Sequence, residues 1–223
     1  IFFMFKKLLK PVLISLAILL LLVAVFVGLV YAGVFGQLYT REELKRFKNE
    51  TASVVYSEDG KIIGKFFSEN RTNVQFKDLP DHVIKALLAA EDVRFYDHRG
   101  IDTRSLIRVL VKSIILRQEE AGGGSTITQQ LAKNMYGRSD HGFLSTPVNK
   151  FKEIILANRL EHIYSKEDIL QLYLNTVPFG EDVFGIESAA QRYFNKGAAN
   201  LGVEEGAVLI GMLPEHARVG LLG

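Results

Sequence analysis

The 223-residue sequence contains no cysteine. The chain therefore forms no disulfide, binds no zinc through thiolates and uses no cysteine nucleophile. Neither sign of charge dominates, since the formal net charge at pH 7 is only +2. So small a basic excess does not indicate nucleic acid as a partner.

Several catalytic signatures are absent as well. The sequence has no Walker motif G-x-x-x-x-G-K-[ST], no G-x-G-x-x-G loop, no Asp-x-Asp pair and no His-Glu-x-x-His. The serine-nucleophile patterns G-x-S-x-G and S-x-x-K are also missing. These absences argue against the common nucleotide-binding, zinc-peptidase and serine-acyl enzymes.

Charged residues are missing from one long segment, because Asp, Glu, Lys and Arg do not occur between Pro11 and Thr40. A helix that spans a bilayer needs about 20 apolar residues, so residues 11–35 are predicted to form a single transmembrane anchor. Three lysines stand within residues 1–10, which places that end in the cytoplasm and the rest of the chain outside it. A cleaved signal peptide is the alternative, although its apolar region is usually only about 7–15 residues long.

The remaining chain divides into two parts. Residues 36–75 are predicted to be a juxtamembrane segment and a β-hairpin, because β-branched and aromatic residues flank an Asp-Gly turn signal. Across residues 76–223, apolar residues recur at three and four positions, and Asp81 and Ser165 occupy positions expected of helix N-caps. The sequence thus predicts a mostly α domain on a small β-hairpin pedestal, with an N-terminal transmembrane helix.

One helix predicted within this domain is basic and amphipathic. In residues 103–117, Leu106, Ile107 and Leu110 share a face that arginine and lysine side chains surround. Such a helix can lie at a lipid surface, or it can be an ordinary core helix with solvated cations. Because the chain has a predicted membrane anchor, we favour the lipid surface.

Glu91 is the first candidate for chemistry. It ends an apolar helical segment and is followed by Phe95, Tyr96 and His98. A carboxyl group in such surroundings is expected to be partly desolvated, which moves its pKa up toward the range useful for a general acid or base. The alternative for Glu91 taken alone is a helix-end ion pair with Arg94 or His98.

The second candidate is the glycine-rich segment from Gly122 to Asn134, GGGSTITQQLAKN. Three glycines allow the backbone to approach a ligand closely, and the helix that follows has free N–H groups that favour an anion. Thr126, Gln130 and Lys133 follow at helical spacing and could bind one polyoxygenated ligand. A flexible loop with a serine cap is the alternative.

Glu153 is the third candidate, because it interrupts an otherwise apolar helical face. A second carboxylate on a separate helix is what glycosyl chemistry often requires. The alternative is an exposed ion pair with Lys150, three residues earlier.

These candidates belong to an ordered series of five motifs. The first two, E-D-x-x-F-x-x-H-x-G and G-G-S-T-I-T-Q-Q-L-x-K-N, begin at Glu91 and Gly123. The other three, K-x-x-E, K-x-x-I-L-x-x-Y-L-N and G-x-x-x-A-x-x-x-Y-F, begin at Lys150, Lys166 and Gly185. In this series the sequence resembles the peptidoglycan glycosyltransferases (glycosyltransferase family 51), the module found in class A penicillin-binding proteins and in monofunctional membrane enzymes.

The resemblance implies a lysozyme-like, two-lobed fold and the polymerisation of lipid II into β-1,4-linked glycan with release of undecaprenyl diphosphate. Glu91 would be the catalytic general base, and Glu153 a second catalytic residue that orients the donor diphosphate or holds a metal. The resemblance requires no cofactor, although a divalent cation, Mg²⁺ or Mn²⁺, could share the charge of the diphosphate. The matched motif positions would bind the substrate: Asp92, Phe95, His98, Gly124, Ser125, Thr126, Gln129, Gln130, Lys133, Asn134 and Lys150.

The resemblance also implies partners and a place in the cell. The partners would be lipid II, the growing glycan strand, lipids of the cytoplasmic membrane and other cell-wall synthesis proteins. The catalytic domain would lie on the extracytoplasmic, periplasmic side of the membrane. The resemblance also implies inhibition by moenomycin, the family's inhibitor.

The sequence departs from the family pattern at two places. Asn149 stands where the family usually has arginine, so a cation near the diphosphates is either lost or supplied by another residue such as Lys152. The chain ends LPEHARVGLLG, which leads to the expectation of an atypical or truncated C-terminus without penicillin binding. Two other functions stay open: a lytic enzyme that cleaves glycan, and a non-catalytic membrane-anchored protein that binds wall precursors.

Overall fold

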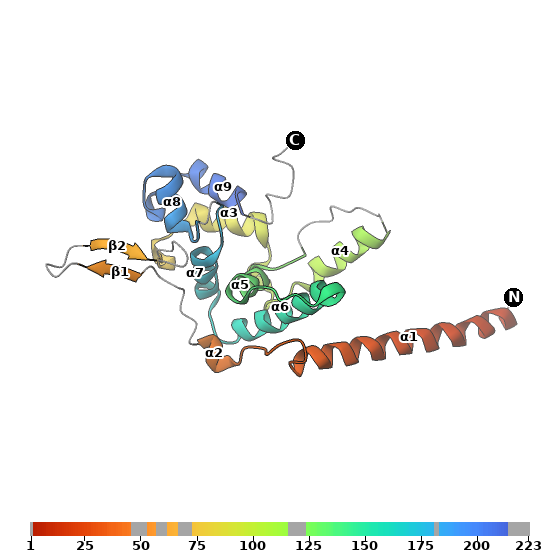
Figure 1. The fold of residues 1–223 in the computed structure, drawn as a ribbon. Helices are drawn as coiled ribbons and strands as arrows, with labels where there is room; N and C mark the ends of the chain where they lie inside the picture. The colour runs from red at the N-terminus through yellow and green to blue at the C-terminus, as the bar shows by residue number, and fades with distance from the viewer. Residues whose placement is uncertain are drawn as a thin grey trace. The chain divides into compact units, whose positions relative to one another are not determined.

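The structure, a computed structural model, describes residues 2–45, 53–56, 62–66, 73–115, 124–180 and 183–213. The described part is mostly helical, as the sequence predicts, and Figure 1 follows its elements along the chain. The chain divides into two compact units. The first comprises Ile1–Tyr39 and Arg138–Lys152, and the second comprises Thr40–Gly137 and Glu153–Gly223.

The first unit contains α1 (Phe2–Tyr31), a long apolar helix. Its segment Lys10–Tyr31 is long and apolar enough to cross a membrane, and most of its side chains are exposed, although Val30 is buried. The helix ends before the predicted anchor boundary at residue 35. It ends there because the chain turns at Gly33 and Gly36, which both have positive φ, a conformation that glycine adopts at little cost.

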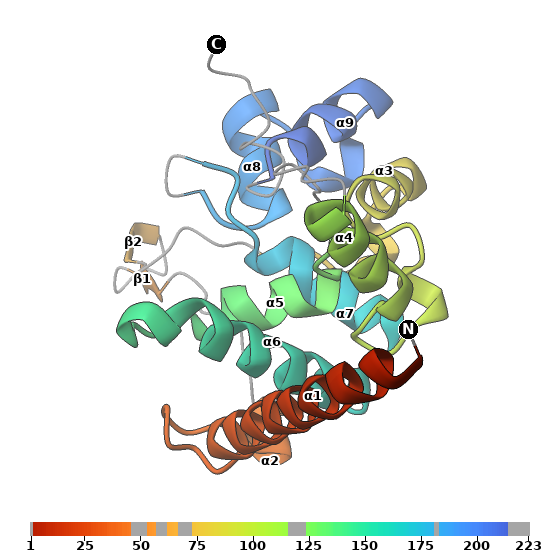
Figure 2. The ribbon, with the colours of Figure 1, turned by 90° about the vertical axis from the view of Figure 1, so that its right-hand side faces the viewer.

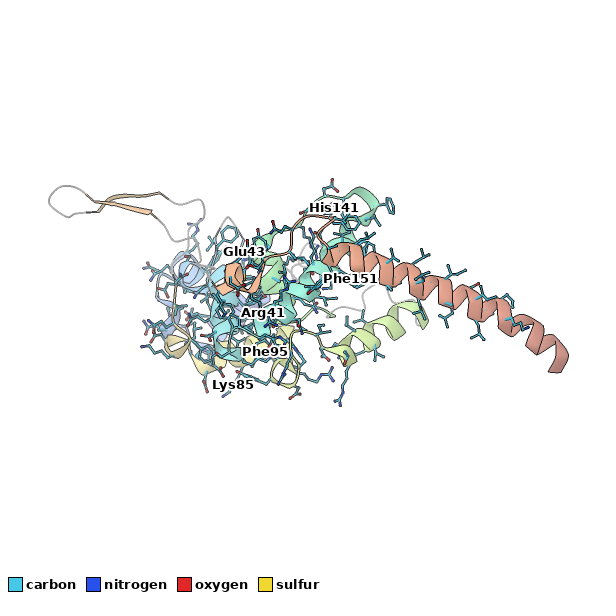
Figure 3. The ribbon with its side chains drawn as sticks, turned by 90° about the horizontal axis from the view of Figure 1, so that it is seen from below. Arg41, Glu43, Lys85, Phe95, His141 and Phe151 are labelled. Atoms are coloured by element: carbon cyan, nitrogen blue, oxygen red, sulfur yellow. The ribbon has the colours of Figure 1, made fainter. Side chains whose placement is uncertain are left out.

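The segment from Arg138 to Lys152 completes the first unit with η3 (Gly142–Leu144) and the start of α6 (Ser145–Glu161). Two edge-on ring contacts join it to α1 and the turn that follows. Phe26 packs on Phe151, and Phe35 packs on His141, with ring centroids 5.6 Å apart in each pair. Figure 3 shows Phe151 and His141 at this end of α1. Aromatic packing therefore fixes the start of α6 on the anchor helix.

Five helices position the functional residues of the second unit. In Figures 1 and 2, α3 lies beside α9, and α5 lies beside α7. Leucine and isoleucine side chains such as Leu87, Leu131, Leu170 and Leu209 are buried between these helices. The bounds are α3 (Asp81–Glu91), α5 (Ile127–Tyr136), α7 (Lys166–Thr176), α8 (Ile186–Phe194) and α9 (Val203–Gly211).

Shorter elements connect these helices. The strands β1 (Ser53–Tyr56) and β2 (Ile62–Phe66) pair antiparallel, which confirms the two strands of the predicted hairpin. The predicted Asp-Gly turn between them lies outside the described residues. The other short elements are α2 (Arg41–Lys45), η1 (Phe76–Asp78), η2 (Phe95–Asp97) and η4 (Ala198–Asn200), and α4 (Thr103–Ile115) is described below.

The two predicted N-caps have different outcomes. Ser165 begins α7 with a capping box, because its hydroxyl accepts from the N–H of Asp168 while the Asp168 carboxylate accepts from the N–H of Ser165, each at 3.1 Å. Asp81 is instead the first residue of α3, and Pro80 is the N-cap. The predicted cap at Asp81 is thus wrong by one residue. The Asp81 carboxylate still stabilises the helix by its interaction with the positive end of the helix dipole.

Gly100 is a tight backbone junction in the second unit. Its φ is +81°, and a Cβ atom placed there would lie 2.9 Å from the carbonyl carbon of Ala157 in α6. The Gly100 carbonyl accepts hydrogen bonds from Thr126 Oγ1 at 2.8 Å and from Gln129 Nε2 at 3.2 Å. Only glycine satisfies both the conformation and the close approach, so the loop after Glu91 can lie against α5 and α6.

We expect Gly100→Ala to lower the free energy of unfolding by at least about 1–3 kcal/mol, the usual cost of backbone strain alone. Chemical unfolding of the full chain in detergent measures this change. Gly211→Ala is the control, because a Cβ atom at this helical position meets no atom within 4 Å. The control substitution should be neutral or stabilising by up to about 1 kcal/mol. Equal losses for the two variants would contradict the assignment of Gly100.

Candidate functional site

Glu91, the last residue of α3, is the centre of the site. One face of α3 is apolar and buried. The helix ends at Glu91 because Asp92 leaves the helical conformation, although the N–H of Asp92 still donates to the carbonyl of Leu88. Gln130 of α5 donates from Nε2 to Oε2 of Glu91 at 2.7 Å. The first and second motifs, which are separated by a long stretch of sequence, therefore meet at this hydrogen bond.

Gln130 is held in turn by α7. The hydroxyl of Tyr173 donates to Oε1 of Gln130 at 2.8 Å. The side chain of Tyr173 is fully buried and Gln130 is only 7% exposed, so this bond forms away from water. Three helices thus contribute one side chain each to a chain of two hydrogen bonds that ends on the Glu91 carboxylate.

Asp92 makes its contacts inside the protein. Its carboxylate lies 2.9 Å from Nε2 of His98 and accepts a hydrogen bond of 3.2 Å from the N–H of Ile127, the first residue of α5. The start of α5 was predicted to attract the anion of a ligand. In the structure the carboxylate of Asp92 accepts a hydrogen bond from one of these N–H groups. This carboxylate interacts favourably with the helix dipole, as the anion of a ligand would. Asp92 thus joins α5 to the loop after Glu91, and the substrate contacts of Asp92 and His98 stay predictions.

The polar stripe predicted on α5 is also directed inward. Thr126 and Gln129 are buried, and both donate to the carbonyl of Gly100. Thr126 Oγ1 additionally caps α5 by accepting from the N–H of Gln129 at 3.2 Å. These two side chains therefore hold the backbone, contrary to the prediction that the whole stripe is presented to a ligand. The half-buried residues of the segment stay the predicted ligand contacts: Gly124, Ser125, Lys133 and Asn134.

The basic residues after Glu91 bind other carboxylates. Arg94 pairs with Asp102 at 2.5 Å, and His98 pairs with Asp92, so neither makes the simple helix-end pair considered for Glu91. Asp102 also caps α4 by accepting from the N–H groups of Arg104 at 3.1 Å and Ser105 at 3.2 Å. Sequence reasoning did not identify this residue, although an aspartate directly before a helix is an N-cap signal.

The surroundings of Asp102 shift its ionisation. Burial alone would raise the pKa of this carboxyl group. The hydrogen bonds from Arg94 and Ser105, together with the charge of Arg94, outweigh burial and hold the pKa of Asp102 well below its ordinary value. The carboxylate therefore stays ionised and links the loop after Glu91 to α4.

Lys166, the first residue of the fourth motif, is the second functional residue that sequence reasoning did not assign. Its ammonium lies 2.8 Å from Oε2 of Glu161 and donates to the carbonyl of His98 at 2.7 Å. It also lies 4.2 Å from the ring centroid of Phe95, which is fully buried. The predicted substrate contact of Phe95 is therefore replaced by a cation–π contact that holds the loop. Thr128 completes the cluster by donating to Glu161 at 2.6 Å.

The third motif lies on α6. Glu153 is only 5% exposed, so it is not the exposed residue that the ion-pair alternative assumes. Asn149 is buried, and its amide exchanges two hydrogen bonds with the backbone of Ser139, at 2.8 and 3.1 Å. In place of the usual arginine the chain thus has a residue that fastens the segment before α6. Lys150 is half-buried and stays a predicted ligand contact.

Lys152 is engaged within the first unit. Its ammonium donates to the backbone carbonyl of Phe35, and burial lowers the pKa of this lysine. A Cβ atom at Gly36 would lie 3.2 Å from the ammonium, so the turn leaves little room there. The prediction that Lys152 supplies the cation missing at Asn149 is therefore not supported, because this cation already stabilises the turn after α1.

The helix α4 has the predicted amphipathic character over its described side chains. Arg104 and Arg108 are exposed, and Ile107 is 61% exposed. An ordinary core helix would bury Ile107, so the core alternative is wrong for this residue. Contact with lipid stays a prediction.

Acid should weaken the second unit through Asp102. Because its folded-state pKa is lowered, Asp102 stabilises the fold above the ordinary aspartate pKa of about 4, and this contribution is lost as the pH falls below that value. Asp102→Asn should lower the free energy of unfolding at pH 7 by about 1–3 kcal/mol and flatten its dependence between roughly pH 5 and 2. Unfolding curves at several pH values measure both effects. Unchanged acid sensitivity in this variant would refute the assignment.

Asn149→Leu should loosen the segment before α6, because both hydrogen bonds to Ser139 are lost while the branched shape of the side chain is kept. Hydrogen–deuterium exchange should show faster exchange of the Ser139 amide, with little change at Gln129 in α5. Retention of the original protection at Ser139 would show that Asn149 does not fasten the segment.

Comparison with known proteins agrees with the motifs. A family model described as Transglycosylase matches residues 59–220. Penicillin-binding protein 1F of Bacillus subtilis (strain 168) is 39% identical over 204 residues, which are 92% of this chain and 27% of the relative. Penicillin-binding protein 1A of Neisseria flavescens is 36% identical over 189 residues, which are 83% of this chain and 23% of the relative.

The chain spans about a quarter of the length of these relatives. The family match nevertheless covers most of the chain and includes all five motifs, and the described part is mostly helical. The chain therefore belongs to the peptidoglycan glycosyltransferase family.

Proposed function

We propose that the protein polymerises lipid II into β-1,4-linked glycan strands and releases undecaprenyl diphosphate. The observation that carries this proposal is the 2.7 Å hydrogen bond from Gln130 to Glu91. It holds the carboxylate of the first motif against the helix of the second, so the residue expected to act on the sugar is oriented by the segment expected to bind the diphosphate. A base that is positioned before the substrate arrives needs little reorganisation during the reaction.

The reaction is a single inverting displacement. Glu91 accepts the proton of the C4 hydroxyl on the N-acetylglucosamine of the acceptor. The oxygen attacks C1 of the donor's N-acetylmuramic acid, and the bond from C1 to the lipid diphosphate breaks. The electron pair of that bond leaves with the diphosphate, and the α-linked donor becomes a β-linked product.

The leaving group carries negative charge, and cations stabilise it as it departs. Lys133 of α5 and Lys150 of α6 are the half-buried cations that the motifs supply for this role. In our proposal Glu153, buried on α6, orients the donor end of the substrate. A divalent cation stays optional. The described residues contain no group of three imidazole or carboxylate side chains that could hold one, so Mg²⁺ or Mn²⁺ would be held chiefly by the diphosphate oxygens.

The proposed site of action is the extracytoplasmic face of the cytoplasmic membrane. The apolar segment Lys10–Tyr31 supports a membrane anchor, and the lysines before it support a cytoplasmic N-terminus. A lipid-linked donor moves in the same bilayer, so the anchor raises the local concentration of enzyme near its substrate. Lipid II, the growing strand, membrane lipid and other cell-wall synthesis proteins are the proposed partners.

Glu91→Gln should leave a folded protein that binds lipid II but polymerises it at least about 10²-fold more slowly, because base catalysis is removed. Gel analysis of glycan strands made from purified lipid II, with and without moenomycin, measures the turnover. Glu204→Gln, at an exposed carboxylate of α9, is the control and should keep full activity.

The same assay separates the other functions. Degradation of preformed glycan without synthesis from lipid II would identify a lytic enzyme. Binding of lipid II without any turnover would identify a non-catalytic protein. If the Glu91→Gln variant polymerises lipid II nearly as fast as the original protein, Glu91 is not the base.

A further inference from the structure

Tyr173 is a buried polar residue to which the proposed reaction assigns no role. It lies in the middle of α7 with a fully buried side chain. Phenylalanine would fill the same space without a hydroxyl group, and a buried hydroxyl is costly unless it is hydrogen-bonded. The hydroxyl donates to Oε1 of Gln130, at 2.8 Å, and Gln130 is the residue that bonds the Glu91 carboxylate.

This arrangement matters because a glutamine amide has two orientations. In one, Nε2 faces Glu91 and donates to it, whereas in the other Oε1 faces the carboxylate and repels it. A donor placed on Oε1 favours the first orientation. It also polarises the amide, so that the bond from Nε2 to the carboxylate becomes stronger. The hydroxyl of Tyr173 is therefore connected to the Glu91 carboxylate through the amide of Gln130.

We propose that Tyr173 is a positioning residue that sets the ionisation of Glu91 through the amide of Gln130. By keeping Nε2 toward Glu91, the tyrosine hydroxyl stabilises the carboxylate and lowers the pH at which it becomes ionised. The catalytic consequence rests on the proposed function, in which the ionised form of Glu91 is the base. The effect on the ionisation of Glu91 does not depend on that function.

Other ionisable groups on the neighbouring segments also act on Glu91. Asp92 is paired with His98, and Arg94 is paired with Asp102. None of these groups changes in the variants below, so a difference in titration between variants reports the bond from Tyr173 to Gln130. Charged groups on the other helices of the second unit include Lys133 on α5, Glu153, Arg159 and Glu161 on α6, Lys166, Glu167 and Asp168 on α7, and Glu204 and Glu205 on α9.

The test is a double-mutant cycle in the full chain, held in detergent micelles. It compares the original protein with Tyr173→Phe, Gln130→Met and the double variant. Tyr164→Phe is the matched control, because its hydroxyl also donates to a partly buried acceptor, the carbonyl of Leu44 at 2.9 Å. Two properties are measured: the titration of the Glu91 carboxyl by ¹³C NMR, assigned with Glu91→Gln, and the pH dependence of kcat/KM with lipid II.

Tyr173→Phe should move the titration of Glu91 and the acidic limb of the rate profile to higher pH by about 0.5–1 unit, the equivalent of one buried hydrogen bond. Gln130→Met should cause a shift of about 1–2 units, because a bond to a charged group is lost. The proposal routes the effect of Tyr173 through Gln130, so it predicts that the double variant matches Gln130→Met. Tyr164→Phe should cause no shift.

The outcomes separate this inference from the proposed function. An unchanged titration in Tyr173→Phe, or a loss of rate that is equal at every pH, would overturn the inference even if polymerisation continues. A shifted titration in a protein that never polymerises lipid II would uphold the inference and reject the function. If Tyr173→Phe does not fold, 3-fluorotyrosine at position 173 keeps the shape and donates a stronger bond. It should then shift the Glu91 titration to lower pH, and no shift would overturn the inference.

Discussion

The hydrogen bond from Gln130 to the carboxylate of Glu91 is the contact on which the rest of the proposed site depends. The bond from Gln130 to Glu91 joins the end of α3 to α5, and the bond from Tyr173 adds α7. Each of these helices is anchored by its own buried apolar face. The position of the carboxylate therefore depends on the packing of the whole second unit, because a displacement of any of the three helices would break the chain of hydrogen bonds.

Most polar residues of the first two motifs serve the same purpose by binding one another. Asp92 receives the first N–H group of α5, Thr126 and Gln129 hold the carbonyl of Gly100, and Lys166 lies between Phe95 and Glu161. These contacts convert the loop after Glu91 into a rigid support. Much of the motif sequence in this chain thus supports the position of Glu91 through contacts within the protein.

The sequence was sufficient to predict the elements that depend on local pattern. The apolar run predicted α1, helical periodicity predicted α3, α4, α6, α7 and α9, and the Ser165 cap predicted the start of α7. The motif series singled out Glu91 and showed the resemblance of the chain to a family. The described structure is mostly helical, as that resemblance implies. Such signals are encoded within a few turns of helix or within short spacings, where the rules of capping and amphipathicity apply.

Pairings between distant residues could not be read in the same way. Nothing in the spacing shows that the glutamine stripe of α5 faces inward, that Asn149 binds the backbone of Ser139, or that Lys152 binds the carbonyl of Phe35. Each partner is fixed by how the helices pack, and a polar residue on a helix has no local signal that tells a buried acceptor from a ligand. The sequence therefore cannot tell which motif residues bind the protein itself and which are left to contact a substrate.

The most direct test of the central claim is a crystal structure of the protein with a lipid II analogue that cannot be turned over. The distance to be measured joins the nearer carboxyl oxygen of Glu91 to the C4 hydroxyl of the acceptor sugar. The account predicts hydrogen-bond reach, about 2.6–3.2 Å, directly or through one water, with Gln130 still bonded to the same carboxylate. An acceptor hydroxyl bound beside another acid such as Glu153, with Glu91 out of reach, would contradict it.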